Sequence, residues 1–342
     1  MSPVLSIILP VYNGEAFLER AIQSVCAQTL KNWELIVIND GSTDSSESIA
    51  LRFCTRDTRI RCLKQQNLGL SAARNAGFRD ARGIYIAYLD ADDYVDADYY
   101  QNMVEYAKKH RTDFMMAGFV REFVHNDIKT HSSHVLFKED ILRSREQKQA
   151  CCDRLFFYHA YIHVWNKLYR RDFLSDHEIC FDEALRFGED VPYNLQCLKY
   201  APSIALIPLA GYHYVCHQGK RLTGEWNSLL WGENRHIYNQ IHSFETSAWK
   251  LNTPWVSSGM YLRGCFLTAE KAIDSGISFR ALRSEFAGFL KEKETARSIR
   301  ILDRRCLSLE FSVYRIVIKS GRPFLFFLSV LIRRGMKRVL GH

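Results

Sequence analysis

The chain has 342 residues, 47% of them hydrophobic and 25% charged, so it has the composition of a globular protein rather than of a fibrous or disordered one. Its net charge of +8 comes from the end of the chain, because residues 291–342 carry 13 Lys or Arg against 4 Asp or Glu. The basic excess therefore describes a local surface, not the body of the protein.

Strand and helix patterns alternate along the first 90 residues. Continuous apolar or β-branched runs predict strands at 4–9, 34–38, 60–64 and 84–89. Apolar residues at helical spacing predict helices at 16–28, 45–56 and 69–81. This alternation is typical of βαβ units, and we expect an α/β fold with a mostly parallel central sheet flanked by helices.

The later part of the chain changes from mixed to helical patterns. Residues 96–118 predict a helix and a strand, residues 120–160 a hairpin or loop and then a helix, and 164–169 and 204–207 two further strands. Helical patterns follow at 226–250, 253–275, 279–296 and 298–319. We therefore expect two domains, an α/β domain at 1–220 and a helical region at 221–342.

Polar residues follow the predicted strands of the first 90 residues, among them Tyr12, Asp40, Asn67 and the acidic segment 90–93. In open α/β sheets, ligands bind beyond the carboxyl ends of the strands. The acidic segment, Asp-Ala-Asp-Asp, places three carboxylates close together, where they repel each other unless a cation or strong donors compensate. One or two carboxylates plus substrate phosphates are the usual protein site of Mg²⁺. The alternative is a solvated acidic turn that caps the following helix.

Four segments in this order resemble the motifs of glycosyltransferase family 2: residues 4–13, 34–44, 67–77 and 89–93. The resemblance weakens after residue 120 and is close to absent beyond 220. It implies a GT-A fold, which is Rossmann-like, with a helical C-terminal extension, and an inverting, metal-dependent hexosyl- or glycosyltransferase that uses a nucleotide-sugar. The segment 90–92 then matches the family's Asp-x-Asp motif.

The resemblance implies a nucleotide pocket at the first two strand ends. Pro10 and Tyr12 form one wall, with the Tyr12 ring against uracil, and Asp40 accepts a hydrogen bond from the uracil imide. An aromatic face plus one carboxylate acceptor suits that base. The alternatives are a core position for Tyr12 and a turn-stabilising role for Asp40, since Asp-Gly is a turn signal.

The resemblance also implies a diphosphate and metal site. Arg74 approaches the diphosphate, Asp90 contacts ribose or sugar within the Asp90-Ala91-Asp92 segment, and Asp92 binds Mn²⁺ or Mg²⁺. Arg74 could instead form an ordinary ion pair on a helix surface. His213 is a candidate to complete the metal site, and a structural, hydrogen-bonded His is the alternative.

The pair Glu189-Asp190 precedes a predicted helix at 191–199. The family has a Glu-Asp pair at this point, and its Asp acts as general base. An inverting transfer needs one carboxylate to take the proton of the acceptor hydroxyl, and a helix N-terminus favours the ionised form. We predict Asp190 as the base, with Glu189 as the second choice and an acidic helix cap as the alternative.

Two further segments are ambiguous. Trp165 could stack on a sugar of the acceptor or lie in the core. The segment 217–223 contains Lys220 and Arg221 and is a candidate loop for contact with the diphosphate.

The basic tail has a short, very apolar run, residues 324–332, with Arg322 before it and four Lys or Arg between 333 and 338. This order suits a helix that lies in an anionic membrane face, and it is too short for the ~20 residues that span a bilayer. The alternative is a helix packed on the body. No nucleic-acid-binding motif accompanies the charge, so we expect no nucleic-acid partner.

The ten cysteines include no C-x-x-C pair and no zinc-ligand spacing, and the first residues show no charged n-region followed by an apolar h-region. We therefore expect free thiols and a cytoplasmic protein that is peripheral on the inner face of the cell membrane.

The sequence and the resemblance together predict transfer of a sugar from a UDP-sugar to a hydroxyl of a growing surface glycan, such as lipopolysaccharide, capsule or exopolysaccharide, free or linked to a lipid. The alternative functions are those of a nucleotidyltransferase and of a nucleotide-sugar-binding protein without glycosyl transfer. The donor sugar, the acceptor, the linkage and the oligomeric state stay open.

Overall fold

The computed structural model describes residues 2–125, 128–157, 162–185, 188–217, 229–248, 250, 255–302, 313 and 316–340. The chain divides into two compact units, Met1–Arg221 and Leu222–His342. Lys220 and Arg221 of the candidate phosphate loop lie outside the described residues.

The first unit begins with the alternating elements that the sequence predicts. They are β1 (Leu5–Val11), α1 (Leu18–Cys26), β2 (Trp33–Asn39), α2 (Ser46–Cys54), β3 (Ile60–Lys64), α3 (Leu70–Asp80) and β4 (Tyr85–Tyr88). The later elements are β5 (Tyr94–Val95), α4 (Tyr99–His110), β6 (Phe114–Ala117), β7 (Phe119–His125), β8 (Ile128–Val135), β9 (Asp140–Leu142), α5 (Arg145–Phe157), β10 (Lys167–Arg170), α6 (Arg171–Asp176), α7 (Asp190–Tyr200), β11 (Ile204–Ile207) and β12 (Tyr212–His217).

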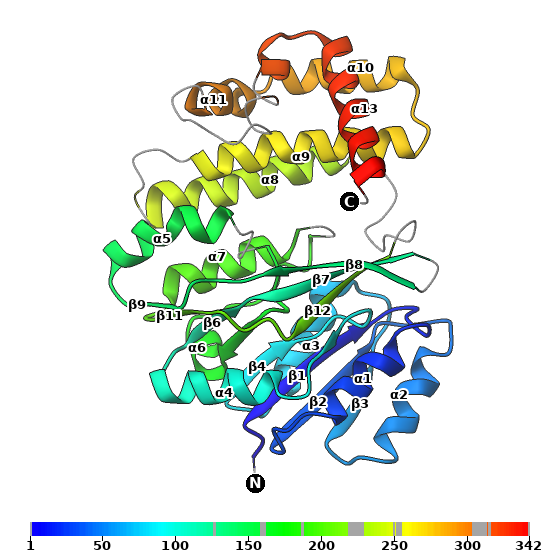
Figure 1. Cartoon of the computed structure of the whole chain (residues 1–342), viewed down its shortest axis with the longest axis vertical. Helices are drawn as coiled ribbons and strands as arrows, with labels where there is room; N and C mark the ends of the chain where they lie inside the picture. The colour runs from blue at the N-terminus through cyan, green and yellow to red at the C-terminus, as the bar shows by residue number, and fades with distance from the viewer. Residues whose placement is uncertain are drawn as a thin grey trace. The chain divides into compact units, whose positions relative to one another are not determined.

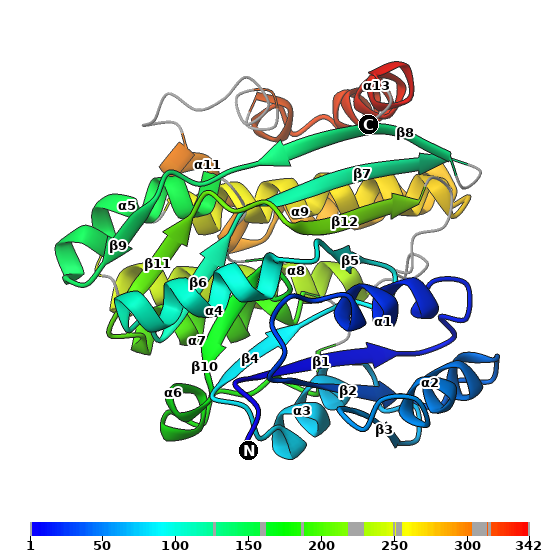
Figure 2. The ribbon, with the colours of Figure 1, turned by 60° about the horizontal axis from the view of Figure 1, so that its bottom comes forward.

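The central sheet has the strand order β3-β2-β1-β4-β10-β6-β11-β9 (Figure 2). Its first four strands are parallel, and β11 is parallel to β6, whereas β10 is antiparallel to both of its neighbours and β9 is antiparallel to β11. The predicted α/β fold with a mostly parallel sheet is confirmed. The carboxyl ends of β1, β2 and β4 thus lie at one edge of the sheet.

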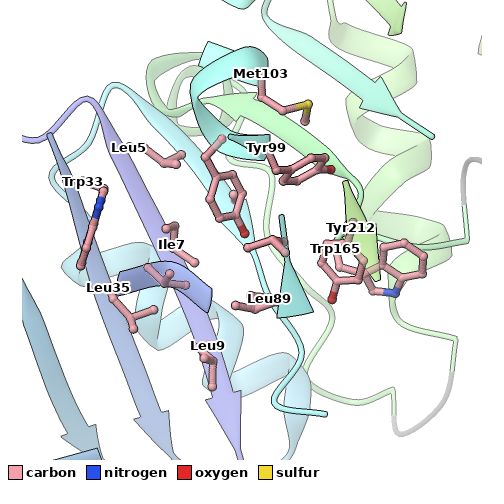
Figure 3. Close-up of a cluster of buried hydrophobic side chains, with 14 of the residues drawn as sticks. Leu5, Ile7, Leu9, Trp33, Leu35, Leu89, Tyr99, Met103, Trp165 and Tyr212 are labelled. Carbon is pink, nitrogen blue, oxygen red and sulfur yellow. The ribbon is translucent and has the colours of Figure 1, made fainter. Parts of the chain in front are cut away.

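Both faces of β1 are covered, which explains its continuous apolar sequence. Leu5, Ile7 and Leu9 lie in a cluster with buried side chains of α1 and α4 (Figure 3). On the other face, α3 lies so close that a Cβ atom at Gly77 would overlap the side chain of Ile8. A glycine at position 77 therefore sets the approach of α3, the helix that carries Arg74.

A second sheet of the first unit has the order β5-β12-β7-β8. The hairpin expected within 120–160 is β7–β8, and its strands are antiparallel with a bulge between Phe123 and Val124. The sequence did not predict β12, which pairs with β5 and β7. This strand begins with Tyr212, whose hydroxyl donates to Asp93 in the acidic segment that follows β4.

The second unit is helical in its described residues, as expected. Its elements are α8 (Leu229–Ser243), the π-helix η1 (Phe244–Ala248), α9 (Trp255–Asp274), α10 (Phe279–Leu290), α11 (Lys293–Leu302) and α13 (Pro323–Leu340) (Figure 1). The single helix expected at 279–296 is two helices, and Thr295 Oγ1 donates to the Phe289 carbonyl at the break. Among the described helices, none has both the length and the apolar character needed to cross a bilayer.

Candidate active site

The acidic segment that follows β4 is held in place through Asp93, which is fully buried. Its carboxylate accepts hydrogen bonds from the Tyr212 hydroxyl (2.7 Å) and the Val215 backbone N–H (2.8 Å). The Tyr212 ring stacks on Trp165, with centroids 4.4 Å apart (Figure 3). Trp165 is 2% exposed and therefore supports this segment from the core, which leaves it no face for stacking on a sugar.

Asp92 is the carboxylate of this segment whose negative charge is compensated only in part. Burial, and then the charge of Asp90, raise the pKa of Asp92 to about 6. Arg20 donates to the Asp92 backbone carbonyl, not to its carboxylate. A hydrogen bond from the Asp92 backbone N–H and the charge of Arg20 oppose this rise in pKa only in part. Such a carboxylate fits a hard divalent cation.

The described residues include no group of three or more His, Cys, Asp or Glu side chains able to hold a metal ion. Mg²⁺ usually binds nucleotides with one or two protein carboxylates and takes its remaining ligands from phosphates and water.

Arg74 of α3 joins the two acidic motifs of the sequence. It is 1% exposed. Its Nη2 atom lies 3.0 Å from Asp90 Oδ1, and its Nη1 atom lies 3.0 Å from Glu189 Oε1 and 2.7 Å from Asp190 Oδ1. The guanidinium also lies over the Phe181 ring, 5.2 Å from its centroid. The structure thus places Arg74 in a buried ion-pair network rather than on a helix surface, with its Nη atoms engaged by carboxylates rather than open toward a diphosphate.

Asp190 is the first residue of α7, directly after Glu189 and after Gly188, whose φ is +71°. Its side chain is 13% exposed. Burial raises the pKa of Asp190, while the neighbouring Arg74 guanidinium opposes that rise. Oδ1 accepts from Arg74, and among the described residues no donor reaches Oδ2. Asp190 therefore has one oxygen atom available to a substrate.

The candidate nucleotide pocket combines an exposed ring with a buried carboxylate. Tyr12 follows β1 and is 47% exposed, whereas Asp40 after β2 is 4% exposed, and Pro10 is buried in β1. The Asp40 carboxylate accepts from the Leu68 and Gly69 N–H groups, both at 2.9 Å, and from Gln65 Nε2 at 2.7 Å. These bonds order the loop after β3. They use three of the roughly four acceptor positions of the Asp40 carboxylate.

Side-chain bonds also tie the loop after β1 to the loop after β2. Asn13, at φ +50°, accepts from the Thr43 N–H (2.8 Å) and donates its own N–H to Ser42 Oγ (3.0 Å). Glu15 and Asp44 exchange similar bonds with each other's loop. The position of Tyr12 relative to Asp40 is therefore fixed by the chain itself.

His213 of β12 lies between two carboxylates. Its Nδ1 atom is 3.0 Å from Glu122 Oε1 and its Nε2 atom is 3.0 Å from Asp96 Oδ1. Its ring stacks on Tyr94, with centroids 4.2 Å apart. Both ring nitrogens are thus engaged by carboxylates of the first unit, so a metal ion would have to displace one of these contacts. This geometry supports the structural alternative for His213.

Two functional candidates were missed in the sequence. Arg20 of α1 contacts the Asp92 carbonyl and lies over the Tyr94 ring, and nothing in the amphipathic pattern of α1 distinguishes it from other exposed Arg residues. Lys167 of β10 is 1% exposed. A charged residue within the strand pattern 164–169 was the signal that could have identified it.

Comparison with known proteins places this geometry in a family context. A family model described as glycosyl transferase family 2 matches residues 6–177. The uncharacterized glycosyltransferase EpsJ of Bacillus subtilis is 38% identical over 220 residues, which are 63% of this chain and 61% of EpsJ. The minor teichoic acid biosynthesis protein GgaB of Bacillus subtilis is 30% identical over 212 residues, 61% of this chain and 22% of GgaB. The matches thus span less than two thirds of each relative.

Among solved structures, residues 1–349 of S. aureus TarS in complex with UDP superpose with a TM-score of 0.60 and 17% identity, over 94% of this chain and 88% of that one. A likeness at this identity shows the fold, which is GT-A-like with a helical C-terminal region.

Proposed function

Since the chain belongs to glycosyl transferase family 2, we propose that it transfers a sugar from a UDP-sugar to a hydroxyl of a growing surface glycan. The glycan would be a lipopolysaccharide, capsule, exopolysaccharide or related polymer, free or linked to a lipid. GgaB, named for minor teichoic acid biosynthesis, supports a surface polymer as acceptor, and the TarS complex with UDP supports the nucleotide. The observation that carries the proposal is the Arg74 network, because it joins a donor site to a base.

The donor site follows from the strand ends. The Tyr12 ring stacks on uracil, and Asp40 uses its remaining acceptor capacity for the imide N–H. Asp90 contacts the ribose or the sugar. A Mn²⁺ or Mg²⁺ ion held by Asp92 and the diphosphate would neutralise the charge that the leaving group gains. Arg74 restrains Asp90, and so aligns the donor side with Asp190.

The transfer is a direct displacement in which Asp190 acts as general base. Its Oδ2 takes the proton of the acceptor hydroxyl while that oxygen attacks the anomeric carbon, on the face opposite the diphosphate. The bond from the anomeric carbon to the phosphate oxygen breaks, and UDP leaves with the electron pair. The configuration at the anomeric carbon is inverted, and Asp190 ends protonated.

The rival readings lack supporting features. A nucleotidyltransferase is expected to have a Gly-rich, basic phosphate loop after its first strand, and residues 10–15 contain no Lys or Arg. A binding protein without catalysis has no need of a buried Arg that holds the Glu189-Asp190 pair close to Asp90.

The helix α13 supports a peripheral contact with an anionic membrane. One face, with Phe326, Phe327 and Val330, is buried in the second unit's core. Five other large apolar side chains are 37–66% exposed: Phe324, Leu325, Leu328, Leu331 and Ile332. The sequence places Arg322 before this stripe and four Lys or Arg after it, between 333 and 338. An exposed apolar stripe beside basic residues complements a bilayer with anionic headgroups, and we place the protein at the inner face of the cell membrane.

A screen of UDP-sugars tests the catalytic proposal. Purified protein, Mn²⁺ or Mg²⁺ and glycan acceptors are expected to release UDP with at least one donor and to extend the acceptor with an inverted linkage. Incorporation of nucleotide into a product, or binding of UDP-sugar without UDP release, would select one of the rivals.

A further inference from the structure

Lys167 places a basic group in the interior of the first unit. It lies on β10 between β4 and β6 and is 1% exposed. Its Nζ atom donates to Asn166 Oδ1 (2.8 Å) and to the His163 backbone carbonyl. Burying an ammonium group is costly, and apolar residues of similar volume are often at least as stabilising in such positions. The fold alone does not explain a lysine here.

The contacts of Lys167 lead to the helix that begins with Asp190. The His163 carbonyl that accepts from Lys167 also accepts from Asn194 Nδ2 of α7 (3.1 Å). Asn194 is fully buried and accepts from the Tyr169 hydroxyl of β10 (3.1 Å). It lies four residues after Asp190, and so about one turn further along the same face of α7. One carbonyl thus joins Lys167 to the helix of the proposed base.

The charges that act on Asp190 are unevenly matched. Arg74, Glu189, Asp90 and Lys167 all interact with it electrostatically, which makes two cations against three carboxylates. Burial raises the pKa of Asp190, and both cations oppose that rise. Burial also lowers the pKa of Lys167 to about 7, and Asp190 opposes that change. Without Lys167, Arg74 alone would balance three carboxylates in an environment where charges are poorly screened.

We propose that Lys167 is a positioning residue for sugar transfer, which holds α7, and with it Asp190, through the His163 carbonyl, and whose ammonium group favours the ionised form of Asp190. It acts through Asp190. The inference rests on the proposed function, in which Asp190 is the general base.

Two variants of Lys167 distinguish the effect of its charge from the effect of its hydrogen bond to the His163 carbonyl. Lys167→Gln removes the charge but keeps an N–H donor for the His163 carbonyl, and Lys167→Met removes both. Lys148→Gln is the matched control, because the Lys148 Nζ atom also donates to two carbonyls, of Ala201 (2.7 Å) and Pro202 (3.2 Å), and Lys148 is not among the charges that shift Asp190. Circular dichroism and thermal unfolding show whether each variant is folded, and Lys167→Gln carries the test if Lys167→Met is not.

The pH dependence of kcat/KM for UDP release is the main measurement. In both Lys167 variants we expect the acid limb to move to higher pH by about one unit, a tenfold change in proton affinity, with UDP affinity unchanged. Lys148→Gln should keep the wild-type profile. An unmoved acid limb in Lys167→Gln would overturn the electrostatic role.

A second measurement does not depend on turnover. The carboxyl ¹³C resonance of Asp190, assigned by its loss in Asp190→Asn, is titrated in wild type and in Lys167→Gln. We expect a higher titration midpoint in the variant, and equal midpoints would overturn the proposal for Lys167. If no UDP-sugar is turned over by the wild type, the proposed function fails and this titration still decides the role of Lys167.

Discussion

The Nη1 atom of Arg74 lies 2.7 Å from Oδ1 of Asp190, although the two residues are 116 positions apart in the chain. The other arm of the same guanidinium holds Asp90, the first residue of the Asp-x-Asp segment. One buried cation therefore sets the distance between the proposed donor site and the proposed base.

Arg74→Lys should lower kcat at least tenfold, because an ammonium group is compact and cannot reach three carboxylates as the planar guanidinium does. Removing the cation in Arg74→Met leaves uncompensated buried charges and should destabilise the fold by about 3–5 kcal/mol. UDP release and chemical denaturation measure the two effects. Arg79→Lys, on the exposed face of the same helix, is the control and should change neither.

Asp190→Asn should lower kcat by about 10²–10⁴, the usual contribution of a general base, and leave the Kd of UDP within a factor of about three. Glu189→Gln should retain more activity, because it leaves the carboxylate of the proposed base, Asp190, in place. Turnover kinetics and calorimetric titration with UDP distinguish these cases. Full turnover by Asp190→Asn would transfer the role to another group.

Asp92→Asn should abolish the response of UDP release to added Mn²⁺ or Mg²⁺, and chelation with EDTA should reduce wild-type activity to the level of the variant. Restoration of activity by the metal in Asp92→Asn would argue against a ligand at this position. UDP release with and without each metal is the measurement.

Asp92 also predicts how the stability of the metal-free protein changes with pH. The folded state raises the pKa of Asp92 to about 6 from 3.8, so the folded state binds a proton between these values that the unfolded state releases. The ionised carboxylate therefore destabilises the folded state most above pH 6, and this penalty disappears as the pH falls toward 4. Asp92→Asn should be more stable than wild type at pH 7.5, with the difference shrinking near pH 4, in thermal unfolding with EDTA present.

Tyr212→Phe removes the hydroxyl that donates to Asp93 (2.7 Å), and should cost about 1–3 kcal/mol because it leaves a buried carboxylate short of a donor. Tyr99→Phe is the matched control, since the Tyr99 hydroxyl is buried without a hydrogen-bond partner among the described residues and its removal should cost little. Urea denaturation of both variants measures the difference. Equal costs would show that the hydroxyl does not support the acidic segment.

The double variant Leu328→Ser/Leu331→Ser should reduce binding to vesicles of phosphatidylglycerol at least tenfold, because it interrupts the exposed stripe of α13. Wild type should bind vesicles of phosphatidylcholine weakly, and added salt should weaken the binding to the anionic vesicles. Cosedimentation gives both affinities. Leu51→Ser, which changes an apolar residue of α2 that is 49% exposed, should bind like wild type.

Binding that is insensitive to the stripe or to lipid charge would contradict the membrane contact. Light scattering on the same samples tests whether the stripe instead binds a second copy of the chain. A wild-type dimer that dissociates in Leu328→Ser/Leu331→Ser would assign the stripe to self-association.

Local sequence patterns determined most of the α/β unit. The continuous apolar runs of β1, β2 and β4 reflect burial on both faces, and the amphipathic spacing between them defined α1, α2 and α3. The family motifs pointed to Tyr12, Asp40 and the acidic segment, because those residues stand where the strands end. Pairing across long separations was not readable in this way, so the strand β12 and the antiparallel insertion of β10 were missed.

The sequence by itself determined the fold class, the family and the acidic motifs, because these depend on periodicity and on residue types at short spacing. Only the tertiary structure decided the partners of the polar groups. It buried Arg74 between Asp90 and Asp190, turned Trp165 into a support for Tyr212, and set His213 between Glu122 and Asp96. The physical reason is that the partner of a charge in a buried site is fixed by packing between elements far apart in the chain, and no local pattern records that distance.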